Sequence, residues 1–83
     1  MGYNIDIDVD IQDDTGCTAL ILASKLGYYK IVKLLIYAKA GLDIQEEYGY
    51  TALIWASTGG YNKIVEILIN AKADLNLQNK YGY

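Results

Sequence analysis

The fold of this chain is decided by the stretch GCTALILASKLGYYKIVKLLIYAKAGLDIQ at residues 16–45. A shift of 33 residues lays it over GYTALIWASTGGYNKIVEILINAKADLNLQ at residues 49–78, and 19 of the 30 aligned positions are identical. A shorter segment occurs three times, as VDIQDDTG (9–16), LDIQEEYG (42–49) and LNLQNKYG (75–82). Agreement at one fixed period predicts a repeat architecture, in which stacked units share a continuous core.

Each repeat is predicted to hold two helices followed by a hairpin segment. Thr18 and Thr51 stand where an N-cap belongs, before the short apolar stretches ALILAS and ALIWAS. Gly27 and Gly60 suit the left-handed residue that follows such a helix. The second helices, YKIVKLLIYA and NKIVEILINA, are apolar over a wide band, so we expect neighbouring repeats to cover them on both sides. Period-2 alternation and a turn glycine complete the unit.

The repeat resembles that of the ankyrin family, whose pattern is G-x-T-P-L-H-x-A-A-x-x-G-H, then V-V-x-L-L, then G-A-D. In the second copy it reads Gly49, Thr51-Ala52-Leu53-Ile54, Ala56-Ser57, Gly60-Tyr61, Ile64-Val65, Leu68-Ile69 and Ala73-Asp74. The departures are alanine for the family's proline (Ala19, Ala52), isoleucine for its first histidine (Ile21, Ile54) and tyrosine for its second (Tyr28, Tyr61). In the family the first histidine hydrogen-bonds and braces neighbouring repeats, and isoleucine can reproduce only its packing.

The resemblance covers residues 9–83 and implies an all-α, helix-turn-helix solenoid with short β-hairpin loops. It divides a single domain, 1–83, into a partial repeat at 1–15, full repeats at 16–48 and 49–81, and the start of a truncated repeat at 82–83. It further implies a protein-binding surface on the hairpins and first helices, and no catalytic function.

Composition excludes several functions. The 83 residues include no histidine and no arginine, and the net charge is −3. Zinc sites of the common kinds and Ser-His or Cys-His pairs are therefore absent, and seven lysines are too few to favour nucleic-acid binding. No apolar run reaches the length of a membrane span, and no signal peptide is recognisable. The single cysteine favours a reducing, cytoplasmic location. We expect no catalytic residue, cofactor or metal.

The acidic run NIDIDVDIQDD at residues 4–14 alternates apolar and acidic residues. Its aspartates match positions 1, 3 and 5 of an EF-hand calcium loop, but Ile11 and Cys17 stand where that loop needs glycine and glutamate. A half-buried strand with a solvated acidic face is therefore favoured over a metal site. In the repeat register the run becomes, from residue 9 onward, the first of the three hairpin segments, and we expect its aspartates to face water.

Aromatic side chains gather near the predicted hairpin turns. Tyrosine provides much contact area with few rotatable bonds, so this row either belongs to a binding surface or packs between adjacent hairpins. Trp55 is open to the same two interpretations, a packed side chain or a binding hot spot. Cys17 is expected to be an inert, partly exposed thiol, and Leu26 an exposed apolar residue. The predicted partner-facing residues are Asp14, Thr15, Cys17, Lys25, Leu26, Glu47, Tyr48, Tyr50, Trp55, Thr58, Gly59, Lys80, Tyr81 and Tyr83.

Self-association is the alternative function. The repeat register starts the chain in the tail of a repeat, and neither end of the array carries a polar cap. Residues 1–14 hold five aspartates and no lysine, whereas residues 15–83 hold seven lysines and five acidic residues. Two explanations compete, a marginal monomeric fragment and copies stacked head to tail into a fibre or ring. The leading prediction is a protein-interaction module, with the self-assembling homo-oligomer as the alternative.

Overall fold

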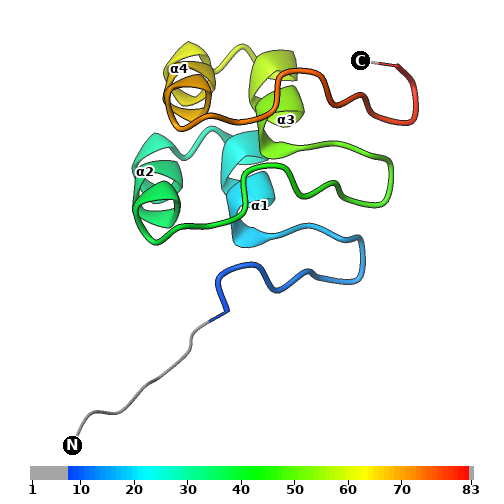
Figure 1. Ribbon diagram of the computed structural model, residues 1–83, viewed down its shortest axis with the longest axis horizontal. Helices are drawn as coiled ribbons and strands as arrows, with labels where there is room; N and C mark the ends of the chain where they lie inside the picture. Colours follow the sequence, from blue (N-terminus) through cyan, green and yellow to red (C-terminus); the bar gives the residue numbers. More distant parts are fainter. Residues whose placement is uncertain (1–7, 83) are drawn as a thin grey trace, which may run out of the picture.

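The computed structural model describes residues 8–82 as two stacked pairs of helices (Figure 1). The helices are α1 (Ala19–Leu26), α2 (Tyr29–Tyr37), α3 (Ala52–Thr58) and α4 (Asn62–Asn70). The first helices α1 and α3 pack against each other and form one layer, and the second helices α2 and α4 form the other. Hairpin turns project from the side of the first helices, away from α2 and α4 (Figure 1). This is the all-α solenoid that the sequence predicts.

The first helices begin at the predicted caps. The side-chain oxygens of Thr18 and Thr51 accept hydrogen bonds from the backbone N–H of Ile21 and Ile54, at 3.2 Å in both repeats. Each cap thereby satisfies one of the donors that a helix N-terminus leaves unpaired. After α1, Gly27 takes up the left-handed conformation (φ 78°) that ends the helix.

The second helices end differently. α2 and α4 are followed by Lys39 (φ 68°) and Lys72 (φ 77°), both in the left-handed region where glycine is the usual residue. The neighbouring contacts hold this strained conformation, because the N–H groups of Ala40 and Ala73 bond the carbonyls of Leu35 and Leu68 within the preceding helix. Because neither position holds glycine, the sequence does not predict that these two helices end in the left-handed conformation.

The core lies between the two helix pairs. Its largest buried side chains include Leu20 and Ile21 of α1, Val32 of α2, and Ile64 and Leu68 of α4. Small residues of α3 (Ala52 and Ala56, both fully buried) let the first helices approach closely. Each of the large aliphatic side chains stabilises the fold by about 1.5–3 kcal/mol through burial.

The hairpin loops are turns without strands. In the first, the N–H of Asp13 bonds the carbonyl of Cys17 and the N–H of Gly16 bonds the carbonyl of Asp13, each at 2.9 Å. The second turn repeats both bonds at 46–50, and the third repeats the bond from the N–H of its glycine, Gly82, to the carbonyl of Asn79. No strand occurs between residues 8 and 82, so the strand expected for the acidic run is not formed in its described part; residues 4–7 lie outside that part. Ile11 is also largely exposed, unlike its counterpart Ile44.

Successive hairpin segments are joined at two levels. Near the helices, the Asp10 carboxylate accepts the N–H of Gly41, and the Asp43 carboxylate accepts the N–H of Asp74, both at 2.8 Å. At the turns, the N–H of Glu47 donates to the carbonyl of Thr15 at 2.9 Å. One repeat later, the N–H of Lys80 donates to the carbonyl of Tyr48 at 2.7 Å. The expectation that the aspartates of the acidic run face water is therefore wrong for Asp10, which joins two repeats.

The second helices are not covered equally. Ile64 of α4 is 1% exposed, whereas Ile31 at the equivalent position of α2 is 46% exposed. Leu34 of α2 is 68% exposed, although its counterpart Ile67 is partly buried. The expectation that both second helices are covered on both sides is thus wrong, because no described element lies beyond α2 at one end of the stack or beyond α4 at the other, and Ile69 of α4 is 43% exposed (Figure 1).

Candidate functional site

A hollow of about 330 Å³ lies between the hairpin turns and the first helices. We call it the groove, and it brings together residues from all three hairpin turns and both first helices. Eight of its nine lining residues are among the predicted partner-facing ones, and the ninth is Glu46. The lining residues are Thr15, Cys17, Lys25, Glu46, Glu47, Tyr48, Tyr50, Trp55 and Tyr81.

Trp55 is the aromatic centre of the groove. It projects from α3 and stacks on Tyr50, with 4.3 Å between ring centroids and 26° between ring planes. The Lys25 ammonium of α1 lies 4.7 Å from the centroid of the Trp55 ring, a cation–π distance. The indole Nε1 is buried and has no hydrogen-bond partner among residues 8–82. Trp55 is therefore a groove side chain held by ring contacts and not by a hydrogen bond.

A second cation–π pair lies at the hairpin turns. The Lys80 ammonium is 5.0 Å from the centroid of the Tyr48 ring, so each of these aromatic faces already holds a lysine. The exposed carboxylate of Glu47 raises the pKa of the Tyr48 phenol above its ordinary value, through its charge and a side-chain hydrogen bond. Within residues 8–82 the ring stack pairs Tyr50 with Trp55, and not with a tyrosine of the neighbouring hairpin as one of the two alternatives has it.

Glu46 lines the groove, although the sequence reasoning did not include it. Its side chain is buried, and its Oε1 accepts the N–H groups of Tyr48 at 2.7 Å and Tyr50 at 3.0 Å. It therefore fixes the turn that presents both tyrosines. A signal was available in the repeat register, because the other two copies carry Asp13 and Asn79 at this position, and each of these also accepts backbone N–H groups two residues or more ahead.

Asp13 shows the same arrangement in the first turn. Its Oδ1 accepts the hydroxyl of Thr15 at 2.7 Å and the N–H groups of Thr15 and Cys17 at 2.9 Å. The hydrogen bond from the Thr15 hydroxyl, helped by the two backbone N–H groups and by the charge of Lys25, lowers the pKa of this carboxyl below its ordinary value of 3.8. The turn is thus organised around an ionised carboxylate.

The remaining predicted residues lie around the groove and do not line it. Leu26, Thr58 and Gly59 are exposed at the ends of the first helices, and Asp14 is exposed in the first turn. Lys80 borders the groove through its contact with Tyr48, while Tyr83 lies outside the described residues. The Cys17 thiol is buried at the edge of the hydrophobic core, not partly exposed as expected.

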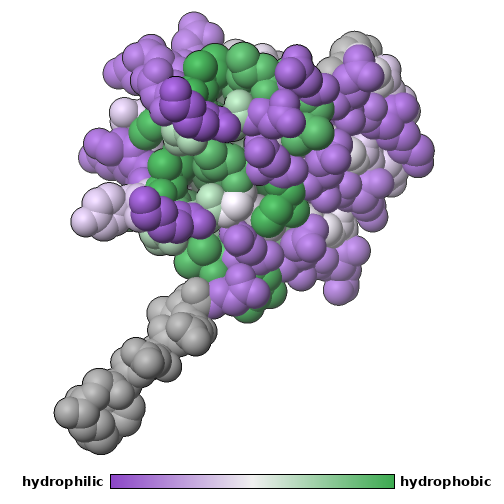
Figure 2. Space-filling view, viewed as in Figure 1, coloured by the Kyte–Doolittle hydropathy of each residue, from purple (hydrophilic) through white to green (hydrophobic). Residues whose placement is uncertain are grey.

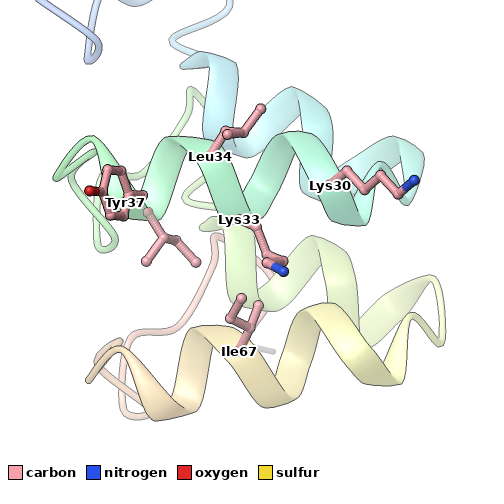
Figure 3. A pocket seen from close by; sticks show the side chains of 6 residues that line it. Lys30, Lys33, Leu34, Tyr37 and Ile67 are labelled. Atoms are coloured by element: carbon pink, nitrogen blue, oxygen red, sulfur yellow. The ribbon is translucent and has the colours of Figure 1, made fainter.

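A larger hollow, about 590 Å³, lies elsewhere, on the side of α2 and α4 (Figure 3). It contains none of the predicted partner-facing residues. It is apolar apart from two lysines at its edge, and Figure 3 shows Ile67 of α4 facing the α2 side chains across it. Its lining residues are Lys30, Lys33, Leu34, Ile36, Tyr37 and Ile67. Nothing at this hollow indicates a particular ligand.

The groove has the chemistry of a contact surface. It offers aromatic faces, amino and carboxylate groups, and no histidine, since the chain has none. Among residues 8–82, no cluster of three or more potential ligands is arranged to hold a metal ion. None of the helices in this part of the chain has the length and apolar character needed to cross a membrane.

The family model described as ankyrin repeats, in three copies, matches residues 3–79. The chain belongs to the ankyrin repeat family. Ankyrin repeats are generally protein–protein interaction modules and generally not enzymes. The match begins before the helices and includes the acidic run, so that run is part of the ankyrin array. A search of curated proteins found no match.

Proposed function

We propose that this ankyrin repeat chain is a non-enzymatic module that binds a partner protein in the groove. The observation that carries the proposal is the convergence of Tyr48, Tyr50, Trp55 and Tyr81 on one hollow beside the hairpin turns. Large aromatic side chains that are open to solvent in a concave surface are the usual source of binding energy in protein interfaces. An intracellular, reducing location belongs to the same proposal, because the Cys17 thiol is unpaired.

The groove is preorganised for this role. Glu46 fixes the turn that carries Tyr48 and Tyr50, and the stacking of Tyr50 on Trp55 restricts both rings. A partner therefore meets aromatic surfaces whose conformational entropy is already reduced, which lowers the free-energy cost of binding. Tyr48 and Tyr81 remain exposed at the rim, where a partner can cover them.

A selection from a displayed library of random peptides tests the proposal. Clones that bind the wild-type chain are measured again on Tyr81→Ala and Tyr48→Ala, which remove exposed rim tyrosines. Tyr37→Ala is the matched control, because Tyr37 is 86% exposed on α2 and does not line the groove. We expect each rim substitution to weaken binding by about tenfold and the control to leave it unchanged. Clones that tolerate both rim substitutions, or a selection that yields no binder, would contradict the proposal.

Self-assembly is a second candidate, favoured by the exposed end faces of the helix stack. Ile31 and Leu34 are exposed at one end where their counterparts pack against a neighbouring repeat, and Leu75 is exposed at the other. A second copy stacked in register would cover these side chains with the same residue types that pack inside the chain. Such a heterologous contact forms a fibre, or a ring if its rotation closes.

Sedimentation equilibrium and electron microscopy test this candidate. If copies stack, the average mass in sedimentation equilibrium should rise with protein concentration. The micrographs should show fibres or rings that become fewer at high salt, because salt screens the attraction between the acidic and lysine-bearing ends. A folded monomer at high micromolar concentration, with no assemblies in the micrographs, would exclude stacking and leave the binding module.

A further inference from the structure

Charge is divided between the two sides of the molecule. The hairpin turns and first helices carry four carboxylates (Asp13, Asp14, Glu46, Glu47) and two lysines (Lys25, Lys80), a net charge of −2. The second helices and the residues that end them carry five lysines and one carboxylate, a net charge of +4; these are Lys30, Lys33, Lys39, Lys63, Lys72 and Glu66. In Figure 2, hydrophilic residues dominate the hairpin side on the right, whereas hydrophobic ones gather over the helices. Three further aspartates (Asp10, Asp43 and Asp74) lie in the hairpin segments close to the ends of α2 and α4, so cations are favoured at the groove by its own carboxylates and not by a repulsion from the opposite side.

Cations also fit the groove at close range. The rings of Trp55 and Tyr48 each hold a lysine ammonium of this chain, at 4.7 and 5.0 Å from the ring centroid. The two aromatic faces are thus oriented so that a positive group lies over them. The raised pKa of the Tyr48 phenol agrees with a negative field at this end of the groove, because Glu47 disfavours a second negative charge beside it.

One carboxylate of the groove is available to a partner. The Glu46 carboxylate is buried and accepts the N–H groups of the turn, so it acts on the turn and not on a ligand. Glu47 is exposed on the same hollow, and beside its hydrogen bond with the Tyr48 phenol its carboxylate keeps lone pairs for a ligand. A cation over the aromatic surface can therefore pair with Glu47 while Glu46 keeps the tyrosines in place.

Lys25 is the present occupant and can be replaced. It is exposed, and an exposed ammonium over a ring is weakly held because water competes for its charge. A guanidinium is planar and less strongly hydrated, so it stacks on an aromatic face more favourably than an ammonium does. When displaced, Lys25 can move toward Asp13, whose pKa it already lowers by its charge.

We propose that the partner of the groove is a basic peptide segment, one of whose arginine or lysine side chains replaces Lys25 over the Trp55 ring and pairs with Glu47. The inference rests on the proposed function and specifies its partner. An acidic segment is disfavoured, since it would meet Glu47 and the two carboxylates of the first turn.

Binding of defined probes tests the inference. The probes are fluorescein-labelled peptides of alternating glycine and arginine, or of alternating glycine and glutamate, titrated at about 50 mM salt so that screening is modest. We expect the arginine peptide to bind saturably and to change the emission of Trp55, the chain's one tryptophan, and the glutamate peptide to do neither. A glutamate peptide that binds more tightly, or no saturable binding of the arginine peptide, would overturn the inference.

Two substitutions separate the groove from general charge attraction. Lys25→Met frees the Trp55 face and should tighten binding of the arginine peptide about two- to fivefold, whereas Lys63→Met on α4 removes the same charge and should have a much smaller effect. Glu47→Gln should weaken binding about two- to fivefold, with Glu66→Gln on α4 as its control. Weaker binding by Lys25→Met, or equal effects of the two glutamate substitutions, would refute the assignment.

The peptide selection distinguishes failure of the inference from failure of the proposed function. Acidic clones that are lost on Tyr81→Ala would keep the groove as the binding site and overturn only its preference for basic partners. Basic clones that tolerate both Tyr81→Ala and Tyr48→Ala would show binding at another face and overturn both. Basic clones that are lost on Tyr81→Ala are the expected result.

Discussion

Ile64→Val and Ile31→Val measure how much the repeat boundary stabilises the fold. The two isoleucines occupy equivalent positions, but Ile64 is 1% exposed and Ile31 is 46% exposed. Removal of one buried methylene from Ile64 should lower the free energy of unfolding by about 1 kcal/mol. The same change at Ile31 removes a group that is about half in water, so we expect a loss of about 0.5 kcal/mol.

Urea denaturation, followed by the emission of Trp55 at low micromolar protein, gives both values from the same probe. Isoleucine is replaced by valine and not by alanine, because two helix pairs form a small core and the loss of a larger part of a side chain could unfold the protein. Equal losses in the dilute monomer would refute the assignment of Ile64 to the core and of Ile31 to an open face. If copies stack, the loss at Ile31 should rise toward that at Ile64 as the protein concentration increases, because the assembly then covers Ile31.

Three further predictions concern single side chains. The buried Ser24 hydroxyl has no hydrogen-bond partner within residues 8–82, whereas Ser57 is exposed. Ser24→Ala should therefore raise the free energy of unfolding by about 1 kcal/mol more than Ser57→Ala does, and equal effects in urea denaturation would contradict this. Lys39→Gly should stabilise by about 0.5–1 kcal/mol, because glycine adopts its φ of 68° without strain, and an unchanged or lower thermal midpoint would count against it. Because the pKa of Asp13 is lowered in the folded state, its contribution to stability is present above pH 3.8 and is lost as the pH falls through the folded-state value. Asp13→Asn should therefore reduce the fall of the urea midpoint at acidic pH, and an unchanged fall would argue against the turn hydrogen bonds.

The helices and their order were predictable because they depend on local rules that recur at a fixed period. Thr18 and Thr51 cap their helices as expected, and Gly27 ends α1 in the left-handed conformation. The ends of α2 and α4 were less evident, since Lys39 and Lys72 adopt that conformation without being glycine. There the packing of the repeat overrides the preference of lysine for negative φ, and no local sequence rule predicts this.

The groove was predictable in its members but not in its internal contacts. Tyr50 and Trp55 were both expected near a binding surface, yet their mutual stacking is a tertiary contact between a hairpin turn and α3 that no local pattern in the sequence specifies. Glu46 was overlooked because a buried glutamate is rare, and only its two backbone hydrogen bonds make the burial favourable. Asp10 was assigned to water because its partner, the N–H of Gly41, lies one repeat away and has no signature of its own.

The two levels of contact between hairpin segments have a mechanical consequence. At the turns, one main-chain hydrogen bond joins each hairpin to the next, and the Gln45 side chain adds a bond to the carbonyl of Gln78, whereas the helices below them share a packed core. Separating two neighbouring turns would break few hydrogen bonds, but separating the helices would expose apolar side chains to water. Local opening of the array should therefore begin at the turns, and a partner bound across them would raise the free energy of that opening.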